Sequence, residues 1–365
     1  MKLAIFAGPT GGHFYPALAF AEAFQKTHPD ARLLFVTGER GRFLAKSAGG
    51  QFKGWFEFLP DFPFPRPGRP DFIIRAFPFL LKLTRAFIRS GEILNDFKPD
   101  LSVGFGSYVA FPGLWVSRKK KIPTLIHEQN RKMGKANARL TRLSDKVALS
   151  FDPEPARASD SAYVVTGLPL RRSLVEYSLK KESVKPSKRF RILVVGGSQG
   201  SQSMNRLWKE ALGLFSDEEK KGLAVIHITG ETDCEVFKAM YPEKGIEALV
   251  FPYHERMEEL YSDADLAVTR AGAGTLFELA LFGLPAIVFP YPYAEAHQEL
   301  NARYFEEQGG LLIRHESELT PAQFKEEILE LMKSQDRRNR MSRQLKELAQ
   351  PHAAEQLVQT AESLL

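Results

Sequence analysis

The chain has 365 residues, which is enough for two domains of ordinary size that each bury a hydrophobic core. Hydrophobic residues make up 44% of it, and this share excludes an intrinsically disordered protein. No run of about 18 apolar residues is present, so we expect no membrane-spanning helix. The apolar run before Gly8 is also too short for a secretory leader. The one cysteine, Cys234, cannot form an internal disulfide, as is usual in a reducing cytosol.

The net charge of +6 is unevenly placed along the chain. Residues 66–89 carry six basic side chains against one acidic one, and residues 118–142 carry nine against one. A basic excess confined to one half of the chain indicates an anionic partner for that half.

Buried strands are predicted to alternate with helices in both halves. In the first half we expect strands at 3–7, 33–36, 100–103, 124–127 and 146–149, and helices at 15–26, 73–97 and 108–117. In the second half we expect strands at 191–195, 224–229, 248–251, 265–269 and 286–289, and helices at 203–215, 257–262, 275–282, 297–307 and 321–333. This alternation is typical of parallel sheets covered on both faces. With a boundary just after residues 166–169, two doubly wound domains would hold a ligand in the cleft between them.

The first loop after a strand is Gly-Pro-Thr-Gly-Gly-His at 8–13. It lacks both the G-x-G-x-x-G pattern and the Lys-Ser/Thr of a P-loop, which disfavours nicotinamide and ATP. Its glycines still allow a backbone anion nest. His13 is expected at a helix start in the cleft, where a neutral imidazole suits a general base. The alternative is a histidine that only caps the helix.

Four polar residues in a row, His127-Glu128-Gln129-Asn130, end a predicted strand of the first half. Burying such a run costs free energy unless its side chains are exposed or bind a ligand. We therefore interpret it as a cleft wall that contacts a sugar. A metal site is disfavoured because His127 and Glu128 are adjacent and point to opposite sides of a strand. No H-E-x-x-H spacing is present either.

Residues 270–278, Arg-Ala-Gly-Ala-Gly-Thr-Leu-Phe-Glu, follow a strand and open a helix in the second half. Backbone N–H groups at such a turn suit a diphosphate, and Glu278 can accept two ribose hydroxyls. The loop Gly-Gly-Ser-Gln-Gly at 196–200 adds Ser198 and Gln199 as further phosphate donors. Turns that only pack a helix on a sheet are the alternative for both segments.

Two more residues suit the same ligand. Arg171, at the expected domain junction, has a planar fork that pairs with phosphate. Gln298 lies three residues from Asn301 in a predicted helix, so both can face sugar hydroxyls. A surface arginine and a capped surface helix are the alternatives.

Residues 73–89 combine apolar and basic side chains in one long predicted helix. Core packing explains part of this pattern, but the combination also fits a helix that rests on anionic lipid. Nucleic acid is a poorer interpretation, because no nucleic-acid-binding motif accompanies the charge.

These motifs, in this order, resemble one family: the bacterial UDP-GlcNAc transferases of peptidoglycan synthesis (the MurG family), which convert lipid I to lipid II. The family motifs G-G-T-G-G-H, H-E-Q-N, G-G-S-Q-G, R-[SA]-G-A-x-T-x-x-E and H-Q-x-x-N-A correspond to residues 8–13, 127–130, 196–200, 270–278 and 297–302. The one departure is Pro9 in place of glycine, which removes a backbone donor from the first loop.

The resemblance implies an α/β fold of GT-B architecture, with two Rossmann-like doubly wound domains facing across a cleft. Residues 1–168 would be the domain that faces acceptor and membrane, and residues 169–350 the UDP-GlcNAc domain. Residues 351–365 would form a helix that packs back toward the first domain. The protein would lie peripherally on the cytoplasmic face of the bacterial plasma membrane, with residues 73–89 on the anionic surface.

The resemblance also implies inverting transfer of GlcNAc from UDP-GlcNAc to the C4 hydroxyl of undecaprenyl-pyrophosphoryl-MurNAc-pentapeptide. His13 is expected to be the general base, with Glu128 second or orienting. The other residues expected at the acceptor are Thr10, Gly11, Gly12, Tyr108 and Asn130. Those expected at the donor are Arg171, Ser198, Gln199, His254 (by its loop, at uracil), Ala273, Gly274, Thr275, Glu278 and Gln298.

No D-x-D motif accompanies the donor loops, so no obligatory metal or other cofactor is expected. Two alternatives stay open. Another UDP-sugar enzyme of the same fold, such as a UDP-GlcNAc 2-epimerase, would not need the basic and apolar pattern of residues 73–89. A non-catalytic UDP-sugar or lipid-binding protein would not need His13 together with Glu128.

Overall fold

A computed structural model describes residues 1–49, 52–62, 72–152, 160–180, 189–197, 200–291 and 297–365. The chain divides into two compact units. The first comprises Met1–Arg172 and Pro351–Leu365, and the second comprises Ser173–Gln350.

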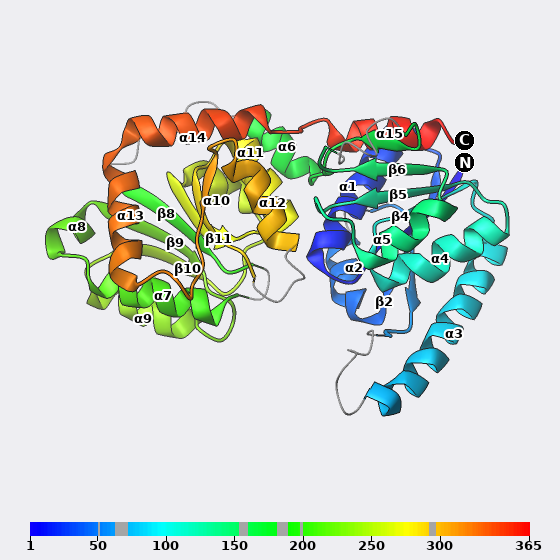
Figure 1. Cartoon of the computed structure of the whole chain (residues 1–365), viewed down its shortest axis with the longest axis horizontal. Helices are drawn as coiled ribbons and strands as arrows, with labels where there is room; N and C mark the ends of the chain where they lie inside the picture. Colours follow the sequence, from blue (N-terminus) through cyan, green and yellow to red (C-terminus); the bar gives the residue numbers. More distant parts are fainter. Residues whose placement is uncertain (50–51, 63–71, 153–159, 181–188, 198–199, 292–296) are drawn as a thin grey trace. The chain divides into compact units, whose positions relative to one another are not determined.

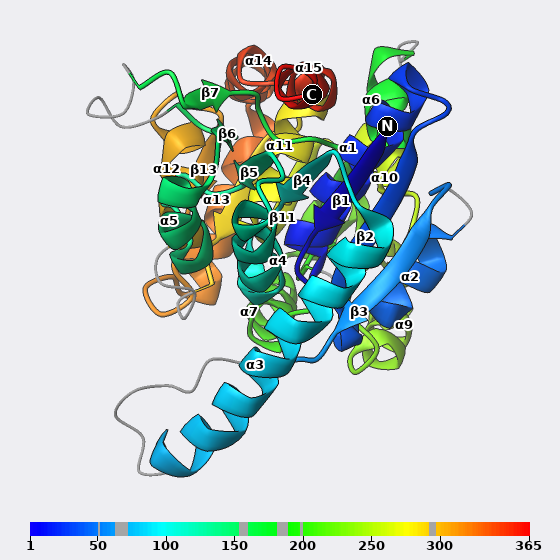
Figure 2. The same ribbon diagram turned by 90° about the vertical axis from the view of Figure 1, so that its right-hand side faces the viewer.

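The first unit contains a seven-stranded parallel sheet in the order β3-β2-β1-β4-β5-β6-β7 (Figures 1 and 2). Its strands are β1 (Lys2–Phe6), β2 (Arg32–Gly38), β3 (Trp55–Leu59), β4 (Leu101–Gly104), β5 (Thr124–Glu128), β6 (Lys146–Leu149) and β7 (Tyr163–Val165). Its helices are α1 (Gly11–Thr27), α2 (Arg42–Ala48), α3 (Phe72–Phe97), α4 (Ser107–Lys119), α5 (Lys135–Leu140) and α15 (Ala353–Glu362).

Alternate residues of β1 belong to two different cores, because successive side chains of a strand point to opposite faces. Leu3 and Ile5 pack in a cluster with residues of α1 and α15. Ala4 and Phe6 pack in a second cluster with residues of α3, α4 and α5. Both faces of the sheet are therefore covered, as parallel sheets require.

The last helix of the chain belongs to the first unit. Leu357, Val358 and Ala361 of α15 are buried in the same cluster as Leu3. At its end, Glu362 accepts a hydrogen bond from His28, just beyond α1, at 2.7 Å. The chain thus returns to its first unit after completing the second.

The second unit contains a six-stranded parallel sheet in the order β10-β9-β8-β11-β12-β13. Its strands are β8 (Phe190–Val195), β9 (Leu223–Ile228), β10 (Glu247–Phe251), β11 (Leu266–Arg270), β12 (Ala286–Phe289) and β13 (Leu311–Ile313). Its helices are α6 (Arg172–Leu179), α7 (Gln202–Gly213), α8 (Asp217–Lys221), α9 (Cys234–Glu243), α10 (Met257–Asp263), α11 (Ala273–Phe282), α12 (His297–Glu306), α13 (Pro321–Lys333) and α14 (Gln335–Glu347).

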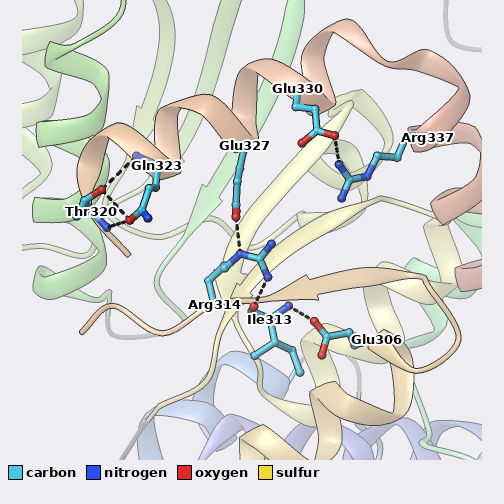
Figure 3. Close-up of polar contacts among 8 residues, drawn as sticks. All are labelled: Glu306, Ile313, Arg314, Thr320, Gln323, Glu327, Glu330 and Arg337. Atoms are coloured by element: carbon cyan, nitrogen blue, oxygen red, sulfur yellow. Dashed lines mark hydrogen bonds and ion pairs between the residues drawn. The ribbon is translucent and has the colours of Figure 1, made fainter. Parts of the chain in front are cut away.

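Polar contacts join both α12 and α13 to β13, the edge strand of this sheet (Figure 3). Thr320 and Gln323 form a capping box at the start of the helix. Arg314, which follows β13, donates to Glu327 of α13 at 2.6 Å. Glu306, at the end of α12, accepts from the backbone N–H of Ile313 at 2.8 Å.

The two sheets confirm the predicted fold class, two Rossmann-like doubly wound domains. The prediction missed the strands β3, β7 and β13 and the helices α2, α5, α6, α8, α9 and α14. It also started α1 four residues late, because Gly11 and Gly12 are poor helix formers. This difference matters for the site: His13 lies inside the first turn of α1.

Candidate active site

In a doubly wound sheet, ligands bind at the carboxyl ends of the strands where the strand order reverses. The order reverses between β1 and β4 in the first unit and between β8 and β11 in the second. The glycine loops that follow β1, β8 and β11 therefore open at these two points.

His13 lies between the loops that follow β1 and β4. A Cβ atom added to Gly8 would lie 3.0 Å from Cδ2 of His13 and 2.4 Å from Cβ of Ser107. Only glycine allows the two loops to approach this closely around the imidazole. On its other side, Nδ1 of His13 lies 3.0 Å from Oε1 of Gln129.

Glu128, at the end of β5, is only 2% exposed and accepts four hydrogen bonds. Oε1 accepts from the backbone and side-chain N–H groups of Asn130, each at 3.0 Å. Oε2 accepts from the backbone of Gly134 and from Nδ2 of Asn137, each at 2.9 Å. Glu128 thus holds the loop after β5 in shape, with both oxygens engaged.

Tyr108 lies near the start of α4, where its hydroxyl donates to a carboxylate oxygen of Asp61. Burial, together with this carboxylate, raises the pKa of Tyr108 above its usual value, so the side chain stays a neutral hydroxyl. At the start of α1, the N-cap residue Thr10 and Gly12 of the first turn are exposed, and a Cβ on Gly12 would meet open space. An incoming group can therefore reach the backbone at this helix start.

In the second unit, Ala273, Gly274 and Thr275 form the first turn of α11. All three are half-buried, and a Cβ on Gly274 would meet nothing within 4 Å. The first N–H groups of a helix have no partner within it, and the helix dipole adds positive potential there. On the second turn, Glu278 is half-buried and accepts a hydrogen bond from the hydroxyl of Tyr261 at 2.7 Å.

Arg270, at the end of β11, is a further candidate residue that the sequence analysis did not single out. Its guanidinium is nearly buried and donates to Ser203 at 3.0 Å, to Glu316 at 2.9 Å and to the carbonyl of Phe289 at 3.2 Å. Arg270 therefore joins the ends of β11 and β12 to the start of α7. Its place at the head of the 270–278 motif was the signal that could have identified it.

The remaining predicted donor residues are placed as follows. Oε1 of Gln298 accepts from the backbone N–H of Tyr291 at 2.8 Å. The ring of His254 packs on Phe251 at 4.8 Å, and among the described residues nothing hydrogen-bonds its buried Nε2. Arg171 belongs to the first unit, where its guanidinium lies over the ring of Tyr15 at 5.2 Å. Ser198 and Gln199 lie outside the described residues.

Two kinds of feature are absent from the described part of the chain. No group of three or more His, Cys, Asp or Glu side chains there could hold a metal ion. None of the helices within the described ranges combines the length and apolarity that crossing a bilayer requires.

Comparison with known proteins gives the class. Residues 3–149 match the glycosyltransferase family 28 N-terminal domain, and residues 191–357 match the glycosyltransferase family 28 C-terminal domain. With its two Rossmann-like units, the chain is a glycosyltransferase of the GT-B fold.

Individual relatives narrow this class. The UDP-N-acetylglucosamine--N-acetylmuramyl-(pentapeptide) pyrophosphoryl-undecaprenol N-acetylglucosamine transferase of Desulfotalea psychrophila is 36% identical over 365 residues, which is 100% of this chain and 97% of the relative. The protein of the same name from Bacillus pumilus is 35% identical over 98% of this chain and 97% of its own length. The crystal structure of Acinetobacter baumannii MurG matches with a TM-score of 0.77 and 30% identity over 99% of both chains. The chain belongs to the MurG family.

A UDP-GlcNAc 2-epimerase from Neisseria meningitidis also matches, with a TM-score of 0.70 over 100% of both chains but only 14% identity. Such a match shows a shared fold and carries no information on activity.

Proposed function

We propose that this chain transfers GlcNAc from UDP-GlcNAc to the C4 hydroxyl of undecaprenyl-pyrophosphoryl-MurNAc-pentapeptide, converting lipid I to lipid II. The observation that carries the proposal is that the two units offer different chemical groups, one suited to binding a nucleotide and the other to accepting a proton. The second unit offers a carboxylate and an open helix N-terminus at its switch point, which suit a nucleotide diphosphate. The first unit offers a half-buried imidazole at its own switch point, which suits a proton acceptor.

Residues 169–350 serve as the UDP-GlcNAc domain in this proposal. Glu278 accepts the ribose hydroxyls, while the N–H groups of Ala273, Gly274 and Thr275 face the diphosphate. Positive potential at this helix end, together with Arg171, stabilises the charge that develops on the departing UDP. Ser198 and Gln199 add donors to the diphosphate, the loop at His254 contacts uracil, and Gln298 contacts the sugar.

Residues 1–168 serve as the acceptor domain, to which residues 351–365 return. His13 removes the proton of the C4 hydroxyl as its oxygen attacks the anomeric carbon from the face opposite UDP. The new glycosidic C–O bond forms while the bond to the diphosphate breaks, and the configuration inverts. Thr10, Gly11, Gly12, Tyr108 and Asn130 lie along the acceptor. Glu128 orients the loop after β5 and does not take the proton itself, because both of its oxygens already accept hydrogen bonds from N–H donors.

The membrane partner of this proposal is an anionic surface on the cytoplasmic face of the plasma membrane, contacted by residues 73–89. Figure 2 shows the first turns of α3 reaching beyond the strands of the first unit. Phe77 is 68% exposed, and Leu81 and Ile88, on the same side of the helix, are exposed as well. Lys82 and Arg85 beside them are also exposed. Arg89, in contrast, is engaged by Glu57 and Glu92.

The test is transfer of radiolabelled GlcNAc from UDP-GlcNAc to a lipid I analogue, with and without the acceptor. Labelled lipid and released UDP that both require the acceptor are the expected result. Interconversion of UDP-GlcNAc with its 2-epimer, without acceptor, would instead identify an epimerase. Binding of UDP-GlcNAc with no turnover of any kind would identify a non-catalytic protein.

A further inference from the structure

Three side chains of the first unit form a continuous hydrogen-bonded chain that ends at His13. Nε2 of His127 lies 2.9 Å from the carbonyl oxygen of Gly167. Nδ1 of His127 lies 3.2 Å from Nε2 of Gln129, and Oε1 of Gln129 lies 3.0 Å from Nδ1 of His13. His127 and Gln129 are almost completely buried, so water does not compete for these contacts.

The carbonyl of Gly167 fixes the proton on His127. A carbonyl oxygen only accepts, so Nε2 of His127 carries a hydrogen and donates it. Burial lowers the pKa of His127 to about 4, so at neutral pH the ring holds a single proton. Nδ1 of His127 is therefore an unprotonated nitrogen that accepts a hydrogen bond.

The orientation of the Gln129 amide follows from the same logic. Its Nε2 faces three acceptors: Nδ1 of His127 and the carbonyl oxygens of Phe105 and His127, each at 3.2 Å. A flipped amide would place Oε1 against all three, with no donor among them. The oxygen of Gln129 must therefore face His13, and it can only accept.

We propose that Gln129 is a positioning residue that sets the tautomer of His13, keeping the proton on Nδ1 and the lone pair on Nε2. Among the described residues, Gln129 is the only one that hydrogen-bonds the His13 ring. Nε2 is then the nitrogen that takes the proton of the acceptor hydroxyl. The catalytic part of this inference rests on the proposed function, whereas the tautomer itself does not.

The direct test is ¹⁵N NMR of the full-length protein labelled at histidine, at a pH where His13 is neutral. The His13 signals are identified by their loss in His13→Asn. The expected spectrum has a protonated Nδ1 and an unprotonated Nε2. A wild-type spectrum with the proton on Nε2 would overturn the proposal, and this measurement requires no variant at position 129.

The kinetic test uses Gln129→Met, which keeps the side-chain volume but removes the acceptor. In this variant we expect the Nδ1–H tautomer of His13 to be no longer the major form. We expect kcat to fall by about tenfold to a hundredfold, with KM for UDP-GlcNAc unchanged. Ser117→Ala is the matched control, because Ser117 is a fully buried hydroxyl of the same unit that bonds Ser102 and the carbonyl of Gly113 rather than His127 or Gln129. It should leave the His13 tautomer in place.

The outcomes separate the two claims. Full turnover in His13→Ala would remove His13 as the general base and leave the tautomer result standing. An unchanged tautomer and an unchanged kcat in a folded Gln129→Met protein would show that Gln129 positions nothing.

Discussion

The hydroxyl of Tyr261 donates a hydrogen bond to Oε2 of Glu278 across 2.7 Å, joining α10 to α11. Tyr261 is only 4% exposed, and its ring packs on Phe282 with 5.5 Å between centroids. The donor is therefore held in place by the core, while the carboxylate that it holds is half-buried at the proposed ribose site. Glu278 is oriented before any ligand arrives, which reduces the entropy lost on binding.

Tyr261→Phe should weaken UDP-GlcNAc binding without slowing turnover. A hydrogen bond to a charged group contributes about 1.5–3 kcal/mol, so the Kd should rise about tenfold to 150-fold while kcat stays the same. Isothermal titration with UDP-GlcNAc measures the first quantity, and steady-state kinetics the second. Tyr177→Phe is the matched control, since Tyr177 packs on the same Phe282, at 6.4 Å, with no hydrogen bond to Glu278. Equal effects of the two variants would contradict the positioning role.

Glu128→Gln should lower stability as well as activity. In one orientation of the new amide, its NH₂ group would face the two N–H donors of Asn130; in the other, it would face those of Gly134 and Asn137. Either arrangement places donor against donor, which should lower the free energy of unfolding by about 2 kcal/mol. Urea unfolding measures this loss, with Glu39→Gln, an exposed carboxylate beside Arg42, as the control. If Glu128 were instead the general base, its variant would show the same loss of stability, but kcat would fall by about 10²–10⁴.

Stability should fall as pH rises from about 5 to 8, because of Glu22 on α1. Burial raises the pKa of Glu22 to about 7, and Arg172 and Arg171 only partly offset this. The folded state therefore holds a proton that the unfolded chain releases near pH 4.5. The stabilisation from protonation is complete below that pH and is lost as pH rises through about 7. Allowing for solvent screening, the loss should be about 1–2 kcal/mol.

Glu22→Gln is the variant that checks this pH dependence. It should match the wild type near pH 5 and exceed it in stability at pH 8, as measured by denaturant unfolding across that range. A wild-type slope retained in the variant would assign the pH dependence to other groups.

Loss of the exposed apolar side chains of α3 should release the protein from lipid. In the triple variant Phe77→Ser, Leu80→Ser, Leu81→Ser, binding to vesicles that contain anionic lipid should fall by at least about tenfold. Phe79 is left intact because its ring packs on Phe62 at 6.1 Å and is half-buried. Val236→Ser, at an exposed site of α9, is the control. Unchanged vesicle binding would exclude α3 as the membrane contact.

Sequence predicted the fold well where a strand is an uninterrupted buried apolar run. β12 is of this kind throughout, and β1 and β6 are of this kind after an initial lysine; the limits of all three were predicted within one residue. β3 was missed because it is an edge strand with an exposed Trp55 and a charged Glu57, which break the pattern. β13 was missed because three residues are too short to show any period.

The candidate site was predictable only where a loop has a sequence motif of its own. His13 and Glu278 each follow a glycine loop after a strand, as expected from their motifs, and their roles remain proposals. Tyr261 is different, because it lies 17 residues before Glu278 in another helix. The pattern of that helix predicts only that Tyr261 is buried and does not predict its hydrogen-bond partner. Gln129 was visible within its motif, yet its partner His13 is 116 residues away. Such pairings are created by the sheet order, which a single sequence does not contain.

The most direct test of the account is a side-by-side comparison of His13→Ala and Glu278→Ala, with kcat measured on a lipid I analogue and Kd measured for UDP-GlcNAc. The account predicts that His13→Ala lowers kcat by about 10²–10⁴ with an unchanged Kd. It predicts that Glu278→Ala mainly raises the Kd, since a lost pair of charged hydrogen bonds is worth a few kcal/mol. Normal turnover in His13→Ala, or normal UDP-GlcNAc binding in Glu278→Ala, would contradict the division of chemistry between the two units.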